Sequence, residues 1–371
     1  MPINHLYRSL RALLVQLRPP NERKTRISNV SWLLTGLFLA GSVHLSKIAA
    51  KKTPSSKTTT LPSAVRRLSR LLDNSAISVR DWYEPLARRL LECQAEKLGE
   101  VRLIVDGTKV GFKHRLLMVS LAYRKRAVPI VWSWVRHEKG HSSSYKQRAL
   151  LSYLRRLVPN KARVLVVGDS EFGAMETLKQ LEEWGWYYVT RQKSSHLVRC
   201  SGRREHQWRS LGELIERAGD KAWLEGALLS RSHAHETNLL LYWKRGEKEP
   251  WLLATNLPTS REALLAYKRR MWIEEMFADF KGNGFDLEST RLRHFGRLSR
   301  LTLAVAILYV WLVENGAEAI KRGRRRLIDR VDRRDYSVFR LGCNMLERTM
   351  AQATEPFTCL LPRSLPKLSG G

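Results

Sequence analysis

Cysteine is scarce in this sequence, and no two cysteines have the CxxC spacing. The four are far apart, at Cys93, Cys200, Cys343 and Cys359. This usage argues against a disulfide framework and against a zinc knuckle, and it is expected of a protein in the reducing cytosol. The first apolar stretch is interrupted by Arg8, Arg11 and Arg18, so the pattern of a secretory signal is also missing.

Acidic residues are few relative to basic ones. Of 371 residues, 66 are Lys or Arg and 35 are Asp or Glu, which gives a net charge of +31 at pH 7. Residues 1–72 hold thirteen Lys or Arg against a single acid, Glu22, and residues 321–334 hold eight against two. A chain this basic is typical of proteins that bind nucleic acid or an anionic membrane surface. Basic regions at both ends favour a long polyanion that is contacted at several points.

One apolar segment, residues 30–50, is nearly long enough to span a bilayer. It contains His44, Lys47 and several Ser, Thr and Gly residues, so we expect a buried helix and no membrane partner, with a membrane span as the alternative. With 43% hydrophobic residues the chain can bury a core, and its length allows two or three compact units.

Residues 1–98 are predicted to form a helical DNA-binding region. A polar break over residues 51–62 precedes a basic helix over residues 63–72, a succession compatible with a helix-turn-helix. A solvated basic helix is the open alternative. The candidate DNA-binding residues of this helix are Arg66, Arg67 and Arg70.

From residue 99 the pattern changes to strands and helices in alternation. Residues 99–193 predict a three-stranded meander and then helix, strand, helix and strand, which is the start of a mixed α/β layer. The expected strands are 101–105, 116–123, 127–134, 163–167 and 187–190, and the expected helices are 143–157 and 175–184.

The second half of the chain is predicted to return to this layer after an insertion. Residues 194–256 are β-rich and contain several Trp residues, and residues 257–330 contain a long helix over 259–281 and an apolar helix over 301–313. Residues 331–371 are assigned to a basic C-terminal tail.

Two acidic residues follow buried strands. Asp106 comes directly after residues 101–105, and Asp169 comes one glycine after residues 164–167. Neighbouring strands would bring the two carboxylates together, and like charges in contact repel unless a cation lies between them. Hard divalent ions such as Mg²⁺ bind such oxygens. The alternative is that each Asp is an ordinary turn former.

A third carboxylate lies on the predicted helix 259–281. At roughly 100° per residue, four polar side chains fall within a stripe about 60° wide; they are Tyr267, Arg270, Glu274 and Lys281. The opposite, core-facing side is expected to carry Leu265, Trp272, Ile273, Met276 and Phe280, with Arg269 intruding on it. A solvated, salt-bridged helix face is the alternative.

The spacing Tyr267-x₂-Arg270-x₃-Glu274-x₆-Lys281 resembles the YREK signature of the insertion-sequence-four family of bacterial DDE transposases. The text DGT at Asp106 resembles the first-Asp motif of that family, and DSEFG at Asp169 resembles its second. The resemblance covers roughly residues 101–293. One departure is that Met271 follows Arg270 where many relatives have Trp.

The resemblance implies an RNase H-like core interrupted by a β-rich insertion between Asp169 and Glu274. It implies that Asp106, Asp169 and Glu274 bind two divalent ions, Mg²⁺ or Mn²⁺, that cut and rejoin double-stranded DNA at transposon ends and target. Tyr267, Arg270 and Lys281 would then hold phosphates of the DNA end.

The same resemblance implies a hairpin intermediate with an extruded base, a homodimer in the synaptic complex, and a bacterial cytoplasmic protein associated with the nucleoid. An extruded base needs an aromatic platform, for which Trp243 and Trp251 are candidates, although each also fits an ordinary β core.

Two other interpretations of the sequence were weighed. A catalytically inactive, transposase-derived DNA-binding protein fits the charge equally well, but it gains nothing from carboxylates near phosphates. The HEKGH sequence at His137 matches the metalloprotease pattern HExxH, but it follows a strand and continues into turn-forming residues, so we reject zinc hydrolysis.

Overall fold

The structure is a computed structural model that describes residues 2–51, 59–111, 114–136, 142–200 and 207–352. The HExxH sequence at 137–141, Cys359 and residues 353–371 of the predicted C-terminal tail lie outside these residues; the earlier part of that tail is a correction, because it contains the helix α11 (Val338–Ala351), which contacts α10 (Phe295–Lys321). The chain forms two compact units, one of residues 1–93, 109–114 and 275–371, and the other of residues 94–108 and 115–274. Two of the boundaries fall inside helices, α5 (Val79–Leu98) and α9 (Met271–Phe280), and the other two fall inside the strands β1 (Glu100–Val110) and β2 (His114–Tyr123).

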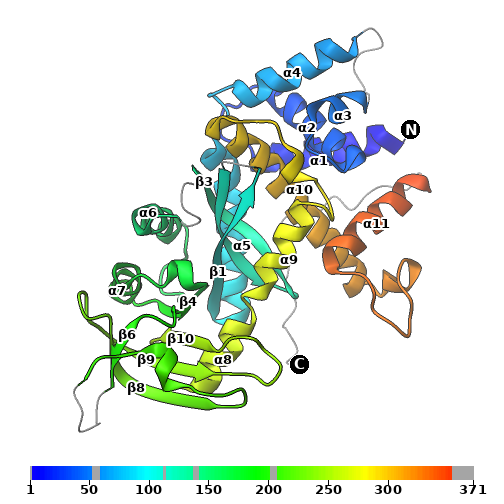
Figure 1. Ribbon diagram of the computed structural model, residues 1–371. Coiled ribbons are helices and arrows are strands. Elements are labelled where there is room, and N and C mark those ends of the chain that lie inside the picture. Colours follow the sequence, from blue (N-terminus) through cyan, green and yellow to red (C-terminus); the bar gives the residue numbers. More distant parts are fainter. Residues whose placement is uncertain (1, 52–58, 112–113, 137–141, 201–206, 353–371) are drawn as a thin grey trace. The chain divides into compact units, whose positions relative to one another are not determined.

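The unit of residues 94–108 and 115–274 is built on a mixed sheet (Figure 1). Its strands have the order β3-β2-β1-β4-β5-β10-β9-β8-β6-β7. The pairs β1–β4 and β4–β5 are parallel. The first five strands are β1 (Glu100–Val110), β2 (His114–Tyr123), β3 (Arg126–Arg136), β4 (Arg163–Gly168) and β5 (Tyr187–Arg191). A three-stranded meander that continues into two parallel strands confirms the predicted RNase H-like mixed sheet.

The turn between β2 and β3 explains why the meander forms so tightly. Arg124 and Lys125 both have positive φ angles, 46° and 59°. Two consecutive residues in the left-handed region are the mark of a two-residue hairpin turn whose twist matches that of the strands.

Helices cover both faces of the core strands. Leu165 and Val167 of β4 pack in one cluster with Ala263 and Ala266 of α8 (Ser260–Lys268). Alternate residues of a strand point to opposite faces, so the buried Val164 and Val166 face the other side. On that side α6 (Ser144–Arg155) contacts β3 and α7 (Met175–Glu183), and α7 contacts β5.

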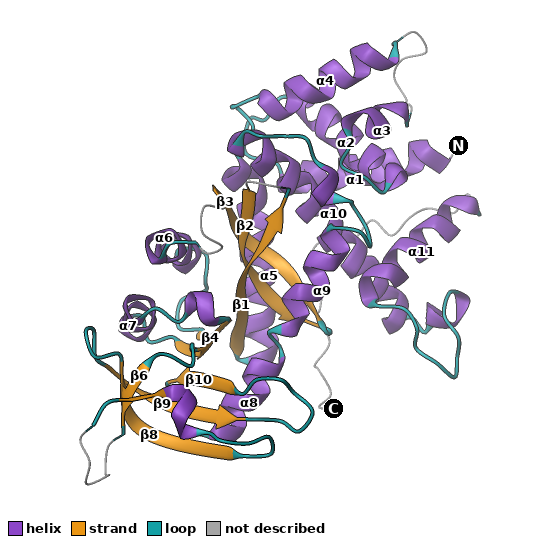
Figure 2. Ribbon diagram, in the orientation of Figure 1, coloured by secondary structure: helices purple, strands orange, loops and turns teal. Residues whose placement is uncertain are grey.

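The β-rich insertion extends the same sheet, as the strands of Figure 2 show. Strand β10 pairs antiparallel with β5, and β9 pairs antiparallel with β10. The inserted strands are β6 (Leu197–Arg199), β7 (Arg209–Ser210), β8 (Lys221–Leu229), β9 (His235–Tyr242) and β10 (Trp251–Thr255).

The other unit is helical and is centred on α10 (Phe295–Lys321), which contacts α2, α4 and α11. Gly316 of α10 and Gly342 of α11 allow a close approach, since a Cβ on either would lie 1.9 Å from a backbone oxygen of the other helix. The remaining helices are α1 (Pro2–Leu17), α2 (Lys24–Ala40), α3 (Leu45–Ala50), α4 (Leu61–Asp73) and α11 (Val338–Ala351).

The apolar segment 30–50 is buried as predicted, but the prediction of one helix is wrong. Gly41 adopts φ 55°, and its N–H bonds to the carbonyls of Leu37 and Phe38, which ends α2 before α3 begins. Among the described residues, the one helix long and apolar enough to span a membrane is α10, and 83% of its most apolar window is buried inside the protein. We therefore interpret α10 as a core helix.

The prediction of one long helix over residues 259–281 is also wrong, because the chain forms two helices there, α8 and α9. The N–H groups of Arg269, Arg270, Trp272 and Ile273 each bond to the carbonyl three residues earlier, at 2.9–3.2 Å. This tighter winding separates α8 from α9. The four signature residues are therefore not on one continuous helical stripe.

Candidate active site

Asp106 and Asp169 lie side by side in the mixed sheet. Strands β1 and β4 are parallel, and Val105 of β1 lies opposite Gly168 of β4. The residue that follows each of these two is an aspartate, Asp106 and Asp169. Each carboxylate accepts a hydrogen bond at 2.7 Å from the following backbone N–H, of Gly107 and of Ser170. Asp106 is 8% exposed, and Asp169 is half-buried.

Arg270 connects the first of these carboxylates to Glu274. Its Nη1 lies 3.1 Å from Oδ2 of Asp106, and its Nη2 donates a short hydrogen bond to Oε1 of Glu274. Arg270 and Glu274 are one turn apart at the start of α9, so the local winding alone brings them together. The guanidinium is 14% exposed and provides the positive charge next to both carboxylates.

Burial raises the pKa of Asp106 from its ordinary value of 3.8 to about 6, although Arg270 and the N–H of Gly107 oppose the shift. The negative charges of Asp169 and Glu274 add to the rise, which means that all three carboxylates influence one another. Burial lowers the pKa of Arg270, but Tyr267 and the three carboxylates raise it by more. The site is therefore a cluster of acids that needs positive charge.

We expect Asp106→Asn to stabilise the protein when metal ions are chelated. Because the folded pKa of Asp106 is above its ordinary value, the ionised carboxylate destabilises the folded state above pH 6, and this cost disappears as the pH falls to 3.8. A shift of about two pKa units corresponds to about 3 kcal/mol at pH 7.5 and to about half of that at pH 5.

The measurement is the free energy of unfolding in EDTA at both pH values. Asp332→Asn, at an exposed aspartate, is the control and should change stability at neither pH. If Asp106→Asn raised the free energy of unfolding equally at both pH values, the gain would not come from removing the ionised Asp106 carboxylate.

The donor set suits a hard cation. The described residues contain no group of three or more His, Cys, Asp or Glu side chains placed to bind one metal ion. The Arg270 guanidinium lies between Asp106 and Glu274. Carboxylate oxygens are the ligands that Mg²⁺ and Mn²⁺ prefer.

The side chain of Tyr267 is buried in the core. Its side chain packs in the cluster that joins α8 to the sheet, and its ring meets that of Trp251 edge to face, 5.0 Å between centroids. Burial raises the pKa of Tyr267 to about 12, with smaller effects from Arg270 and Asp169. Leu265, expected to face the core, is 47% exposed, whereas Ile273, Met276 and Phe280 are buried as predicted.

The remaining predicted residues lie outside this cluster. Lys281 belongs to the helical unit, where its Nζ forms an ion pair with Glu288 at 2.6 Å. Trp251 packs between Tyr242 and Tyr267, and the Nε1 of half-buried Trp243 donates to the carbonyl of Glu247.

A buried ion pair that the sequence did not reveal supports both aspartates. Arg115 of β2 donates to Glu171, two residues after Asp169, and a Cβ on Gly107, directly after Asp106, would lie 2.5 Å from the Arg115 side chain. Glu171 also accepts hydrogen bonds from the N–H (2.6 Å) and hydroxyl (2.5 Å) of Ser142. This network holds the segments that follow Asp106 and Asp169. The DSEFG motif contains Glu171, but nothing in the motif indicates its partners.

The strand order is that of an RNase H-like core, and the paired aspartates lie at its centre. A family model described as a transposase DDE domain matches residues 97–311, more than half of the chain, and the chain belongs to that family. No match was found among the curated proteins. A similar solved structure is the cryo-EM structure of the piggyBac transposase synaptic complex with hairpin DNA. It is 10% identical, with a TM-score of 0.44, and the match covers 100% of this chain and 84% of that one.

Proposed function

We propose that this protein is a cut-and-paste DNA transposase of the YREK type, encoded by a bacterial insertion sequence and acting in the cytoplasm at the nucleoid. The observation that carries the proposal is the register of β1 and β4, which puts Asp106 beside Asp169 in a chain of the transposase DDE family. Glu274 is the third acid of the site through its link to Arg270.

Asp106, Asp169 and Glu274 are the residues that would hold two divalent ions, Mg²⁺ or Mn²⁺. Such a pair of ions, when bound, activates water and stabilises the leaving oxygen of an in-line displacement at a phosphodiester. The residues of this chain hold the ions and orient the DNA. Arg270, released from the carboxylates, can hold a phosphate of the DNA end with two hydrogen bonds, and Lys281 adds a point charge.

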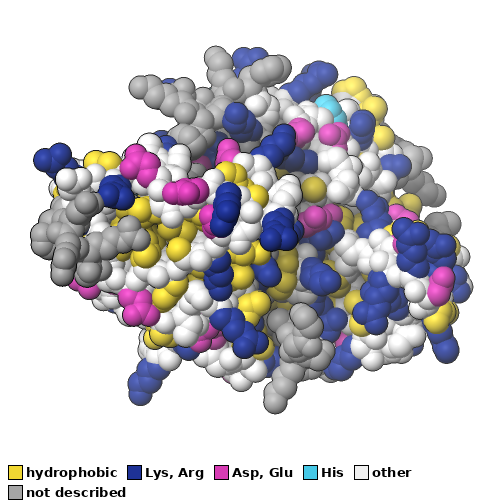
Figure 3. All heavy atoms as spheres, turned by 60° about the horizontal axis from the view of Figure 1, so that its bottom comes forward, with side chains coloured by type: hydrophobic (Ala, Val, Ile, Leu, Met, Phe, Trp, Pro, Cys, Tyr) yellow, Lys and Arg dark blue, Asp and Glu magenta, His cyan; other side chains and the backbone are white. Residues whose placement is uncertain are grey.

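The DNA partners are the transposon ends and the target, bound by a dimer in the synaptic complex. Basic side chains are spread over the face of the molecule shown in Figure 3, with fewer acidic ones among them, which suits a polyanionic partner. A hairpin on the transposon end would require an extruded base. Half-buried Trp243 suits that role better than Trp251, whose ring is engaged by Tyr242 and Tyr267.

The test is strand cleavage by the full chain on duplexes that carry the ends of its own element. We expect cleavage in Mg²⁺ or Mn²⁺ and none in EDTA. Specific binding of these ends without cleavage in either metal would overturn the proposal in favour of an inactive DNA-binding protein.

We expect the double change Arg66→Ala and Arg70→Ala to weaken binding to the element's ends more than binding to random DNA. Both side chains are exposed on α4, opposite its buried leucines, and are available for DNA. Binding to both DNAs, measured across a range of salt, gives the preference and the number of phosphate contacts, since each contact contributes about 0.9 to the slope.

Arg67→Ala is the matched control on the same helix. The guanidinium of Arg67 bonds to Asn29 at 2.9 Å and lies 5.2 Å from the centre of the Trp32 ring, so its loss should lower stability rather than DNA preference. Deletion of residues 1–98 would be a poorer test, because it also removes the helices that contact α10. An unchanged preference in the double variant would assign end recognition to another part of the chain.

A further inference from the structure

A cavity lined by three arginines lies at the opposite end of the β1–β4 pair from the paired aspartates. Its volume is about 340 Å³, and it is bordered by Arg102, Arg163 and Arg269, with Glu100 and Glu262 as its acids. Glu100 and Arg163 are paired residues at the starts of their strands. Asp106 is six positions after Glu100 on β1, which is about 20 Å along a strand.

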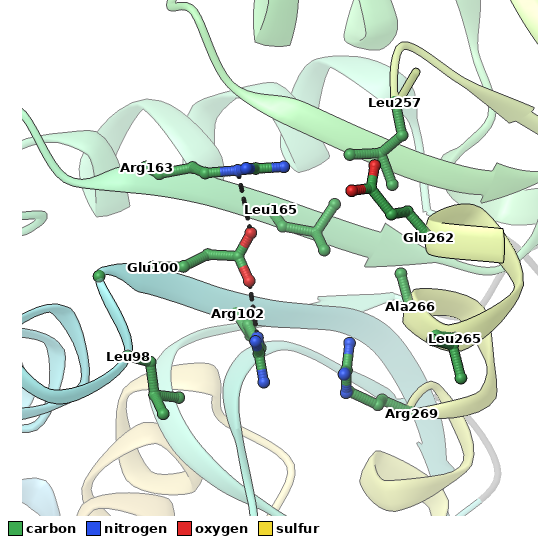
Figure 4. A pocket seen from close by; sticks show the side chains of 11 residues that line it. Leu98, Glu100, Arg102, Arg163, Leu165, Leu257, Glu262, Leu265, Ala266 and Arg269 are labelled. Carbon is green, nitrogen blue, oxygen red and sulfur yellow. Dashed lines mark hydrogen bonds and ion pairs between the residues drawn. The ribbon is translucent and has the colours of Figure 1, made fainter. Parts of the chain in front are cut away.

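The acids of the cavity leave one guanidinium without a counter-charge. Glu100 forms ion pairs with both Arg102, at 2.6 Å, and Arg163, at 3.1 Å, as the dashed lines in Figure 4 show. Among the described residues, Arg269 forms no ion pair. Glu262 lies on the side of the cavity nearer Leu257, away from Arg102 and Arg269 (Figure 4).

Arg102 and Arg269 face each other across one part of this cavity (Figure 4). Burial lowers the pKa of Arg269, and the positive charge of Arg102 lowers it further, with only partial relief from Glu100. An arginine stays charged under these conditions, so Arg269 is a partly buried cation beside a second cation, an arrangement that an anion would relieve. Arg163 is held in place by stacking on Tyr187, 4.5 Å from the ring centre.

Arg269 reaches the cavity from the end of α8, where it shares one face of the helix with Glu262, Leu265 and Ala266, which also line the cavity. Its neighbour Arg270 points elsewhere, to Asp106 and Glu274.

We propose that this cavity binds a phosphate of the DNA backbone, as an anchor separate from the carboxylate site. Planar guanidinium groups bind phosphate oxygens in pairs of parallel hydrogen bonds, and Arg102 and Arg269 provide two such groups around one opening. A distance of about 20 Å corresponds to about six base pairs of duplex. The inference rests on the proposed function, because it takes DNA as the partner.

The experiment measures binding of a random-sequence duplex to the full chain at a series of NaCl concentrations. Arg269→Ala should make the slope of log K against log salt shallower by about one, because one phosphate contact is lost. Arg102→Ala should have the same effect, and Arg269→Lys should keep most of the slope. Lys268→Ala removes the same charge from the adjacent exposed residue and should leave the slope nearly unchanged.

Three outcomes would overturn the inference. In the first, the Arg269→Ala slope equals that of the wild type, or the Lys268→Ala slope falls as much. In the second, inorganic phosphate raises the melting temperature of the wild type but not of Arg269→Ala, while the DNA slopes are identical, so that the occupant is free phosphate. In the third, the wild type does not bind duplex DNA at all, and the proposed function fails with the inference. If the wild type binds DNA and Arg269→Ala has the same slope of log K against log salt, the phosphate anchor is refuted and the proposed function is not affected.

Discussion

Asp106→Asn, Asp169→Asn and Glu274→Gln should each reduce strand cleavage by on the order of a thousandfold or more. Metal ions contribute several kcal/mol of charge stabilisation to a phosphodiester displacement, and each 1.4 kcal/mol is a factor of ten in rate. Each change removes a negative oxygen ligand while keeping nearly the same shape. DNA binding should be retained or slightly strengthened, because a negative charge near phosphates is lost.

The carboxylate variants are best measured as a set, with cleavage and binding assayed on the same cognate duplex. Glu216→Gln is a matched control, since Glu216 is an exposed acid outside the cluster of Asp106, Asp169 and Glu274. Cleavage near the wild-type rate in one of the three variants would remove that residue from the site. A parallel loss of DNA binding would instead indicate a folding defect, which the free energy of unfolding would reveal.

The two aspartates could be predicted because their positions depend on local pattern. Short apolar runs before Asp106 and Asp169 predict buried strands that each end at an acid. That the two strands are neighbours, although β2 and β3 lie between them in the chain, follows from the order of the sheet and not from the local pattern. The buried face of α4 was predictable for the same reason, as Leu68, Leu71 and Leu72 follow helical spacing and are buried.

The helix break at residues 269–270 could not be predicted, because nothing local specifies it. Lys268, Arg269 and Arg270 are all good helix formers, and neither Gly nor Pro is present. The break follows from tertiary packing, since the core side of α8 is committed to β4 and β5. The Arg115–Glu171 pair escaped prediction because its partners are 56 residues apart and meet only through the register of the sheet.

The signature arginine has two roles that an Arg270 series can separate. Arg270 contacts oxygens of Asp106 and Glu274, so a divalent ion that binds these carboxylates would compete with it for the same oxygens. In the proposed reaction it holds a phosphate. Arg270→Gln should therefore bind Mn²⁺ more tightly than the wild type in the absence of DNA and yet cleave less.

The expected losses of cleavage rate follow from the strength of charge-assisted hydrogen bonds. Each such bond contributes about 1.5–3 kcal/mol, which corresponds to a change in rate of roughly tenfold to a hundredfold. Arg270→Lys keeps the charge but loses the paired hydrogen bonds to phosphate, so cleavage should fall by this factor while Mn²⁺ affinity stays near that of the wild type. Isothermal titration with Mn²⁺ and single-turnover cleavage give the two readouts, with Arg261→Gln as the exposed control on α8. Weaker Mn²⁺ binding by Arg270→Gln would show that the arginine assists the ion instead of competing with it. Normal cleavage by both variants would remove Arg270 from the reaction and leave it as a structural partner of Asp106.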